Sequence, residues 1–144
     1  MVYGFGTPNV QKMRERLDIE WLIKTLGYEK DCDVRRKAAN ALGKIGDSRA
    51  VGPLIRALND SDSRIRSWAA TSLFKIGEPA IEPLIKALND SESEVRSAAA
   101  KALGDIGDYR AMKPLTKALD DTCVDVGTSA KEALHKMSMS RGCG

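Results

Sequence analysis

A unit of about thirty residues repeats along this chain, and no other feature constrains its fold as strongly. The segment PLIRALNDS at residues 53–61 returns as PLIKALNDS at residues 83–91 and, in a more divergent form, at residues 114–122. This period is typical of helical arrays, in which one helix pair cannot bury its own apolar face and must stack on its neighbours.

The second half of the unit keeps the same spacing. Arg35, Arg66 and Arg96 follow one another at steps of 31 and 30 residues, and Gly127 stands at the fourth position. In residues 65–76 the apolar side chains recur three and four residues apart, which places them along one side of a helix. Each unit therefore predicts two helices joined by a short polar turn, and the whole chain predicts about four such pairs.

Glycine, proline and short polar side chains mark where these helices should begin, bend and end. A left-handed residue is expected after each second helix, at Gly46, Gly77 and Gly107. Prolines inside the first helices should bend them, at Pro53, Pro83 and Pro114. Capping boxes are expected where second helices begin, formed by Ser91 with Glu94 and by Thr122 with Asp125.

The repeats predict one all-α domain over residues 1–144. Its expected parts are an N-terminal extension and capping helix at 1–18, repeats at about 19–50, 51–80, 81–111 and 112–139, and a loose tail at 140–144. The end repeats are the most divergent, as capping repeats should be.

The unit resembles the HEAT repeat, in the short form found in phycobilisome lyase-type HEAT-like proteins. The resemblance covers residues 19–138 and rests on a proline in the first helix, a turn aspartate, and a Val-Arg or Ile-Arg pair that opens the second helix. These residues are Pro53, Asp60, Ile65 and Arg66 in one copy and Pro83, Asp90, Val95 and Arg96 in the next. The ending Ala-Leu-Gly-x-Ile-Gly also matches, at 41–46 and at 102–107. The fourth copy departs from the pattern, with Gly127 in place of the arginine.

The resemblance implies a right-handed α-solenoid whose second helices line the concave side. The chain looks like a small free-standing member of this family, of the type found in archaea and cyanobacteria. It also implies a structural ladder in which each turn aspartate accepts hydrogen bonds from the arginine of the preceding unit. The expected pairs are Arg35 with Asp60, Arg66 with Asp90, and Arg96 with Asp121.

Residues for catalysis or metal binding are scarce. A metal site needs three or four convergent ligands, but His135 is the single histidine and the three cysteines, Cys32, Cys123 and Cys143, lie far apart in sequence. The iron-dependent deoxyhypusine hydroxylases resemble this fold and use repeated His-Glu pairs, and the chain contains no such pair. Carboxylates recur at equivalent turns, which favours capping over catalysis. The sequence therefore predicts no cofactor, no metal and no enzyme activity.

The outward positions of the second helices, with Ser129 among those of the fourth repeat, form a candidate partner-binding face. Six of these positions are basic, against two acidic residues, Asp105 and Glu132. Trp68 has no aromatic counterpart in the other copies, so it either anchors a partner or fills space. The predicted partner-binding residues are Arg36, Lys37, Asn40, Lys44, Trp68, Thr71, Lys75, Lys101 and Lys136.

We interpret the chain as a non-catalytic scaffold that binds an acidic segment or helix of another protein along this face. Two alternatives remain: a nucleic-acid-binding HEAT-like protein, and an accessory subunit of a bilin lyase-like enzyme. The net charge of +3 and the aromatic content of 5% are low for a nucleic-acid-binding domain. The sequence shows neither a signal peptide nor an apolar run of about 18 residues, so we expect a monomeric cytoplasmic protein that binds no membrane.

Overall fold

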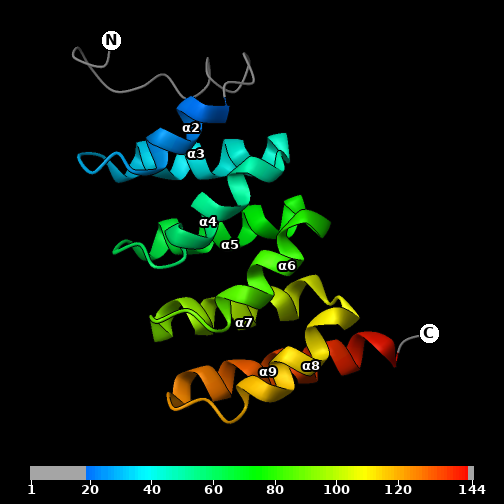
Figure 1. Cartoon of the computed structure of the whole chain (residues 1–144). Helices are drawn as coiled ribbons and strands as arrows, with labels where there is room; N and C mark the ends of the chain where they lie inside the picture. The colour runs from blue at the N-terminus through cyan, green and yellow to red at the C-terminus, as the bar shows by residue number, and fades with distance from the viewer. Residues whose placement is uncertain (1–18, 143–144) are drawn as a thin grey trace. The chain divides into compact units, whose positions relative to one another are not determined.

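The computed structural model describes residues 19–142, and within this range it contains helices and turns but no β-strand. The prediction of an all-α chain built from HEAT-like helix pairs is confirmed (Figure 1). The predicted capping helix within residues 1–18 and the last two residues lie outside the described range.

The chain divides into two compact units, Met1–Ile76 and Gly77–Gly144, and within residues 19–142 each holds two helix pairs. From residue 19 onward, unit 1 consists of α2 (Ile19–Leu26), α3 (Cys32–Ile45), a 3₁₀ turn (Ser48–Ala50), α4 (Val51–Ala57) and α5 (Ser63–Ile76). Unit 2 consists of α6 (Glu78–Ala87), α7 (Ser93–Ile106), a 3₁₀ turn (Tyr109–Ala111), α8 (Met112–Ala118) and α9 (Val124–Arg141).

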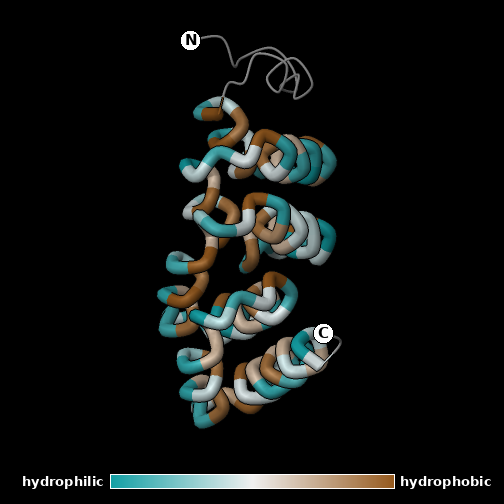
Figure 2. Tube along the Cα trace, turned by 90° about the vertical axis from the view of Figure 1, so that its right-hand side faces the viewer, coloured by the Kyte–Doolittle hydropathy of each residue, from teal (hydrophilic) through white to brown (hydrophobic). Residues whose placement is uncertain are grey.

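The core of each unit lies between its short first helices and its long second helices. In unit 1, α3 packs against α2 and α5, and α4 packs against α5; in unit 2, α7 packs against α6 and α9, and α8 packs against α9. Hydrophobic and hydrophilic stretches are interspersed along the chain (Figure 2), as expected for amphipathic helices that bury one side. Burying each large aliphatic side chain contributes about 1.5–3 kcal/mol. The fully buried leucines are Leu22, Leu42, Leu54, Leu58 and Leu73 in unit 1, and Leu84, Leu103 and Leu115 in unit 2.

Two glycines let the second helices of each unit approach closely. A Cβ atom added to Gly43 of α3 would lie 2.7 Å from Cβ of Ser72 in α5. A Cβ atom added to Gly104 of α7 would lie 2.7 Å from Cα of Ala133 in α9. Both distances are far shorter than a van der Waals contact, so these positions require glycine.

The expected helix ends are present at two of the three glycines. Gly46 and Gly107 have φ near +75° and ψ of 17°, and their N–H groups bond the carbonyls of Leu42 and Leu103. Gly77 also has a positive φ of 71°, but its ψ of −121° lies outside the left-handed helical region. Gly77 instead leads directly into α6.

The prediction that all three prolines bend the first helices is wrong for Pro53 and Pro114. A 3₁₀ turn precedes α4 and α8, so each helix begins only two residues before its proline. Both prolines therefore lie in the first helical turn, where the missing N–H group would have no intrahelical acceptor. Pro83 does lie inside its helix, at the sixth position of α6.

The capping boxes are also absent, and the C-terminal tail is shorter than expected. The N-cap residues of α7 and α9 are Glu92 and Cys123, whose side chains make no capping bond. The turn aspartates do this work, since Asp90 accepts from N–H of Glu92 at 2.9 Å and Asp121 from N–H of Cys123 at 2.8 Å. Helix α9 continues to Arg141, so the tail predicted to begin at residue 140 is still helical there.

Candidate functional site

The second helices of unit 1 are held in a fixed register by Ser72. Its buried Oγ donates to the carbonyl of Ala39 at 2.7 Å, and the same side chain fills the space left by Gly43. Ser72 of α5 thus lies midway between residues 39 and 43 of α3, and a residue of α3 lies level with the residue 31 positions later in α5. Lys37 is therefore beside Trp68, and Lys44 beside Lys75.

Seven of the predicted partner-binding residues lie on this outward side of α3 and α5, which we call the unit 1 face. Lys37, Lys44, Thr71 and Lys75 are exposed there, and Arg36, Asn40 and Trp68 are half-buried. Among residues 19–142, Lys37, Lys44 and Lys75 form no ion pair, whereas Arg36 lies 3.5 Å from Asp33. The unit 1 face therefore presents cations that are free to bind an external anion.

Asn40 lies in the middle of the unit 1 face. Its Oδ1 atom is shielded from solvent and has no hydrogen-bond partner among the described residues. A shielded acceptor without a hydrogen bond typically lowers the free energy of unfolding by about 1–3 kcal/mol. The fold therefore tolerates a polar side chain that does not stabilise it.

We expect Asn40→Ala to leave the free energy of unfolding unchanged or to raise it by up to about 1 kcal/mol, since it removes this acceptor and alanine favours helix. Urea denaturation measures the change. Thr71→Ala is the control, because the exposed Thr71 hydroxyl bonds only the carbonyl of Ser67 in its own helix. A clear loss of stability in Asn40→Ala would show that this side chain supports the fold.

Sequence reasoning missed a second aromatic residue on α5. The side chain of Phe74 is 53% exposed, and it follows Thr71 by three residues, which places the two on one side of the helix. Its counterparts in the second helices before and after it are Gly43 and Gly104. An aromatic residue at a position that holds glycine in two other copies was the signal that could have revealed it.

The second-helix face of unit 2 is different. Lys101 is exposed, but Lys136 forms an ion pair with Asp105 on the neighbouring helix. Ser129, which was counted among the outward positions, is buried, and its hydroxyl lies 2.7 Å from that of Ser97. The helix register turns Ser129 toward α7 because the small residues of α7 and α9 allow close packing. Polar groups of unit 2 thus bond one another on this face.

The arginine–aspartate pairs predicted as a ladder are present inside each unit. In unit 1, Nη2 of Arg35 donates to Oδ1 of Asp60 at 3.2 Å. In unit 2, Arg96 bonds both carboxylate oxygens of Asp121, at 2.9 and 3.0 Å. All four side chains are at most 16% exposed. The third pair, of Arg66 with Asp90, would join residues of different units and stays a prediction.

These bonds fix the charge states of the ladder in unit 2. The hydrogen bonds from Arg96 and from N–H of Cys123 lower the pKa of Asp121, and the bond to Asp121 raises the pKa of Arg96. At the opposite end of α7, side-chain and backbone bonds from Arg110 lower the pKa of Asp108 to about 2. The ladder carboxylate therefore stays ionised and bonded at neutral pH, which suits a structural role.

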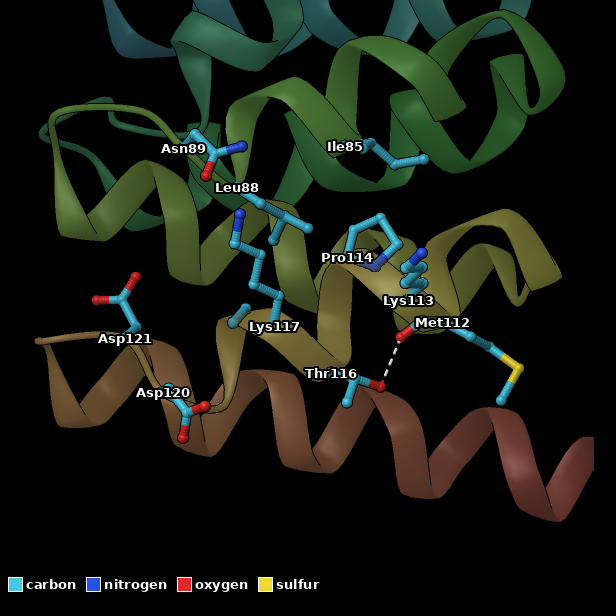
Figure 3. Close-up of a pocket in the computed structure, with 11 residues that line it drawn as sticks. Ile85, Leu88, Asn89, Met112, Lys113, Pro114, Thr116, Lys117, Asp120 and Asp121 are labelled. Carbon is cyan, nitrogen blue, oxygen red and sulfur yellow. Dashed lines mark hydrogen bonds between the residues drawn. The ribbon is translucent and has the colours of Figure 1, made fainter.

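A groove in unit 2 lies on the other side, between the first helices α6 and α8. It encloses about 1000 Å³ and is lined in part by Ile85, Leu88 and Pro114. In Figure 3, Lys117 reaches up toward Leu88, and Asp120 lies below and to the left of it. Charges of both signs at its rim give this groove little electrostatic preference for a ligand.

Other chemistry has little support in the described part of the chain. Within residues 19–142, no three His, Cys, Asp or Glu side chains come together in a way that could hold a metal ion. Cys32 and Cys123 are both half-buried free thiols, and His135 is exposed on α9. None of the helices described here is both long and apolar enough to cross a membrane.

The fold is that of an α-helical repeat protein, since the same helix pair, close glycine contact and arginine–aspartate pair recur along the chain. A family profile described as HEAT repeats matches residues 19–92 and 75–135. The chain belongs to the HEAT-repeat family, and the predicted likeness to the repeats of the lyase type is confirmed by the two relatives that follow.

The phycocyanobilin lyase subunit alpha of Picosynechococcus sp. (strain ATCC 27264 / PCC 7002 / PR-6) is 49% identical over 45 residues, which are 31% of this chain and 17% of that protein. The complex of CpcE and CpcF of phycocyanin lyase from Nostoc sp. PCC7120 is similar in structure, with a TM-score of 0.51 and 28% identity over 90% of this chain and 56% of that one.

Human deoxyhypusine hydroxylase in complex with glycerol aligns with a TM-score of 0.74 over 95% of this chain and 49% of that one. At 23% identity this likeness shows the fold alone. The chain thus spans only 17–56% of the length of these three proteins. The two lyase proteins are named as an enzyme subunit and as a complex of lyase subunits.

Proposed function

We propose that this chain is a non-catalytic HEAT-repeat scaffold that binds another protein, through an acidic segment, on the outward side of its second helices. The observation that carries the proposal is the unit 1 face, where exposed lysines without ion pairs share the outward side of α3 and α5 with the half-buried Trp68, and Lys37 is level with it. An aromatic side chain bordered by polar groups is the usual anchor of a protein interface.

Trp68→Ala tests this function. We expect capture of the native partner to weaken by about tenfold or more, because a buried interface tryptophan typically contributes at least about 2 kcal/mol. Binding is measured by surface plasmon resonance after the partner has been identified by pull-down from native lysate and mass spectrometry. Helicity and the melting temperature should change little.

Tyr109→Ala is the matched control, since Tyr109 is an aromatic residue that is 70% exposed but belongs to unit 2 and is not one of the residues of the unit 1 face. Equal capture by the wild type and Trp68→Ala would contradict an anchoring role for Trp68. If Trp68→Ala and Tyr109→Ala weakened capture of the partner equally, the binding would be non-specific contact with exposed aromatic residues.

A role as an accessory subunit is a second candidate, favoured by the likeness to the lyase complex of two subunits. Such a subunit would use the same face to bind an enzyme. Co-expression with a lyase-type HEAT-repeat partner, followed by size-exclusion chromatography, tests it; separate elution of the two chains would argue against this role.

Nucleic-acid binding is the remaining alternative, and it predicts affinity that falls steeply as salt rises. Titration with duplex and single-stranded DNA at low salt tests it. We expect no specific binding, because the basic residues without ion pairs form a small cluster on the unit 1 face.

A further inference from the structure

At one equivalent pair of positions on neighbouring second helices, the two units carry different combinations of charge. In unit 2, Asp105 of α7 and Lys136 of α9 form an ion pair across neighbouring second helices. The positions 61 residues earlier, at the corresponding crossing of unit 1, are Lys44 and Lys75. The repeat therefore places two lysines side by side in unit 1 where unit 2 has a matched pair of charges.

The lysine pair is unfavourable within the free chain. The axes of packed helices lie about 8–10 Å apart, so two exposed ammonium groups on neighbouring helices repel each other weakly through solvent. Both are exposed, and neither has an acidic partner in residues 19–142. A bound carboxylate would turn this repulsion into attraction, which the ion pair of unit 2 achieves internally.

The other end of the unit 1 face shows the same contrast. Lys37 and Trp68 lie level with each other, seven residues before the lysine pair and thus about 10 Å away along the helices. Their counterparts in unit 2 are Ala98 and Ser129, and Ser129 is buried against Ser97. Unit 1 thus offers cations and an aromatic surface where unit 2 offers small residues that bond one another.

We propose that recognition of the acidic partner is confined to unit 1, with carboxylates of the partner bound between Lys44 and Lys75 and an apolar side chain packed on Trp68 beside Lys37. This inference rests on the proposed function and locates its site. Its occupant is an acidic peptide segment that carries at least one apolar residue about 10 Å, or two helical turns, from its carboxylates.

A nucleic-acid strand fits this surface less well. A strand presents phosphates along its whole length, and a protein that binds it needs a continuous basic track with several stacking aromatics. The unit 1 face has one tryptophan among a few lysines, with Phe74 also exposed on α5, and the matching positions of unit 2 mix Asp105 and Glu132 with Lys101 and Lys136. A short cluster of this kind matches a few carboxylates in a peptide.

The test uses the full chain and a fluorescein-labelled helical peptide of Glu, Ala and Leu, with a second peptide in which Gln replaces every Glu. Lys44→Asp recreates the Asp–Lys arrangement of unit 2, and Lys44→Gln removes the charge alone. Lys101→Asp is the matched control, because Lys101 is an exposed lysine of the unit 2 face and its replacement changes the net charge equally. Fluorescence anisotropy gives each Kd, and circular dichroism verifies folding.

We expect Lys44→Asp to weaken binding of the acidic peptide by about tenfold or more, Lys44→Gln by a smaller factor, and Lys101→Asp by less than about twofold. The Gln peptide should bind weakly to every variant. Equal weakening by Lys44→Asp and Lys101→Asp would overturn the confinement to unit 1 and leave the proposed function standing. Tighter binding of a single-stranded oligothymidine than of the acidic peptide would overturn the peptide as occupant.

Failure of the wild-type chain to bind the acidic peptide would also overturn this inference. The proposed function would still stand if capture of the native partner depended on Trp68, and would fall with the inference if it did not.

Discussion

Gly104→Ala should lower the free energy of unfolding by about 1–3 kcal/mol, the usual cost of forcing one additional carbon into a packed core. The new Cβ would lie 2.7 Å from both Cα and Cβ of Ala133, and a backbone atom cannot move aside without shifting α9. Gly43→Ala should have a similar effect, because its Cβ would meet Cα, Cβ and Oγ of Ser72 at 2.7–2.8 Å. Urea denaturation followed by circular dichroism measures both changes.

Gly52→Ala is the control for this prediction. Gly52 also lies in a helix, but a Cβ atom there would have only the end of the Arg56 side chain nearby, at 3.9 Å. Alanine at this position should stabilise the chain by about 0.5–1 kcal/mol through its helix propensity. If Gly104→Ala stabilised the protein as Gly52→Ala does, the close crossing of α7 and α9 would be wrong.

Asp121→Asn should lower the melting temperature by several degrees near pH 7 and have much less effect near pH 3. The carboxylate of Asp121 accepts two bonds from Arg96 and one from N–H of Cys123, and the amide of asparagine keeps only part of these and loses the charge. Bonded groups that are almost fully shielded from solvent contribute more than an exposed pair does.

The pH dependence follows from the direction of the pKa shift. The bonds from Arg96 and Cys123 lower the pKa of Asp121 in the folded chain below its ordinary value of 3.8. This group therefore contributes stability above the unfolded pKa and loses that contribution as the pH falls through the folded pKa. Melting curves of the wild type and the variant should converge toward pH 3.

Asp105→Asn serves as the control, because the Asp105–Lys136 pair is 46% and 62% exposed and should contribute little at either pH. A difference between wild type and Asp121→Asn that stayed the same from pH 7 to pH 3 would contradict the role of the ionised carboxylate in the ladder.

The repeat made most of the fold predictable. Apolar residues at helical spacing, a polar turn and a terminal glycine predict each helix pair, and the pairs are present from Ile19 onward. The misses concern local chemistry at helix starts. The turn aspartates replace the predicted serine and threonine capping boxes, since Asp90 and Asp121 bond the N–H groups of the residues two positions later. Because 3₁₀ turns precede α4 and α8, Pro53 and Pro114 lie in the first turn of their helices, where a proline breaks no intrahelical hydrogen bond.

The candidate site was predictable only in part. Counting along the helices placed Lys37, Lys44 and Lys75 correctly on an exposed side, because exposure follows from helical period. The same counting failed for Ser129 and did not reveal that Phe74 is exposed. The counting also predicted one basic row over all four repeats. In the structure Lys136 pairs with Asp105, so the cluster of lysines without ion pairs lies in unit 1.

By itself, the sequence determined the all-α class and the helix pairs from Ile19 onward, because these depend on the spacing of residue types along one chain. The resemblance to HEAT-like repeats supplied the ladder pairs of Arg35 with Asp60 and of Arg96 with Asp121. Only the tertiary structure decided which charges neutralise one another, which small residues let helices touch, and where lysines stand unpaired. Those properties depend on distances between atoms of different helices, and a residue in one helix meets its partner in the next through packing that no local pattern encodes.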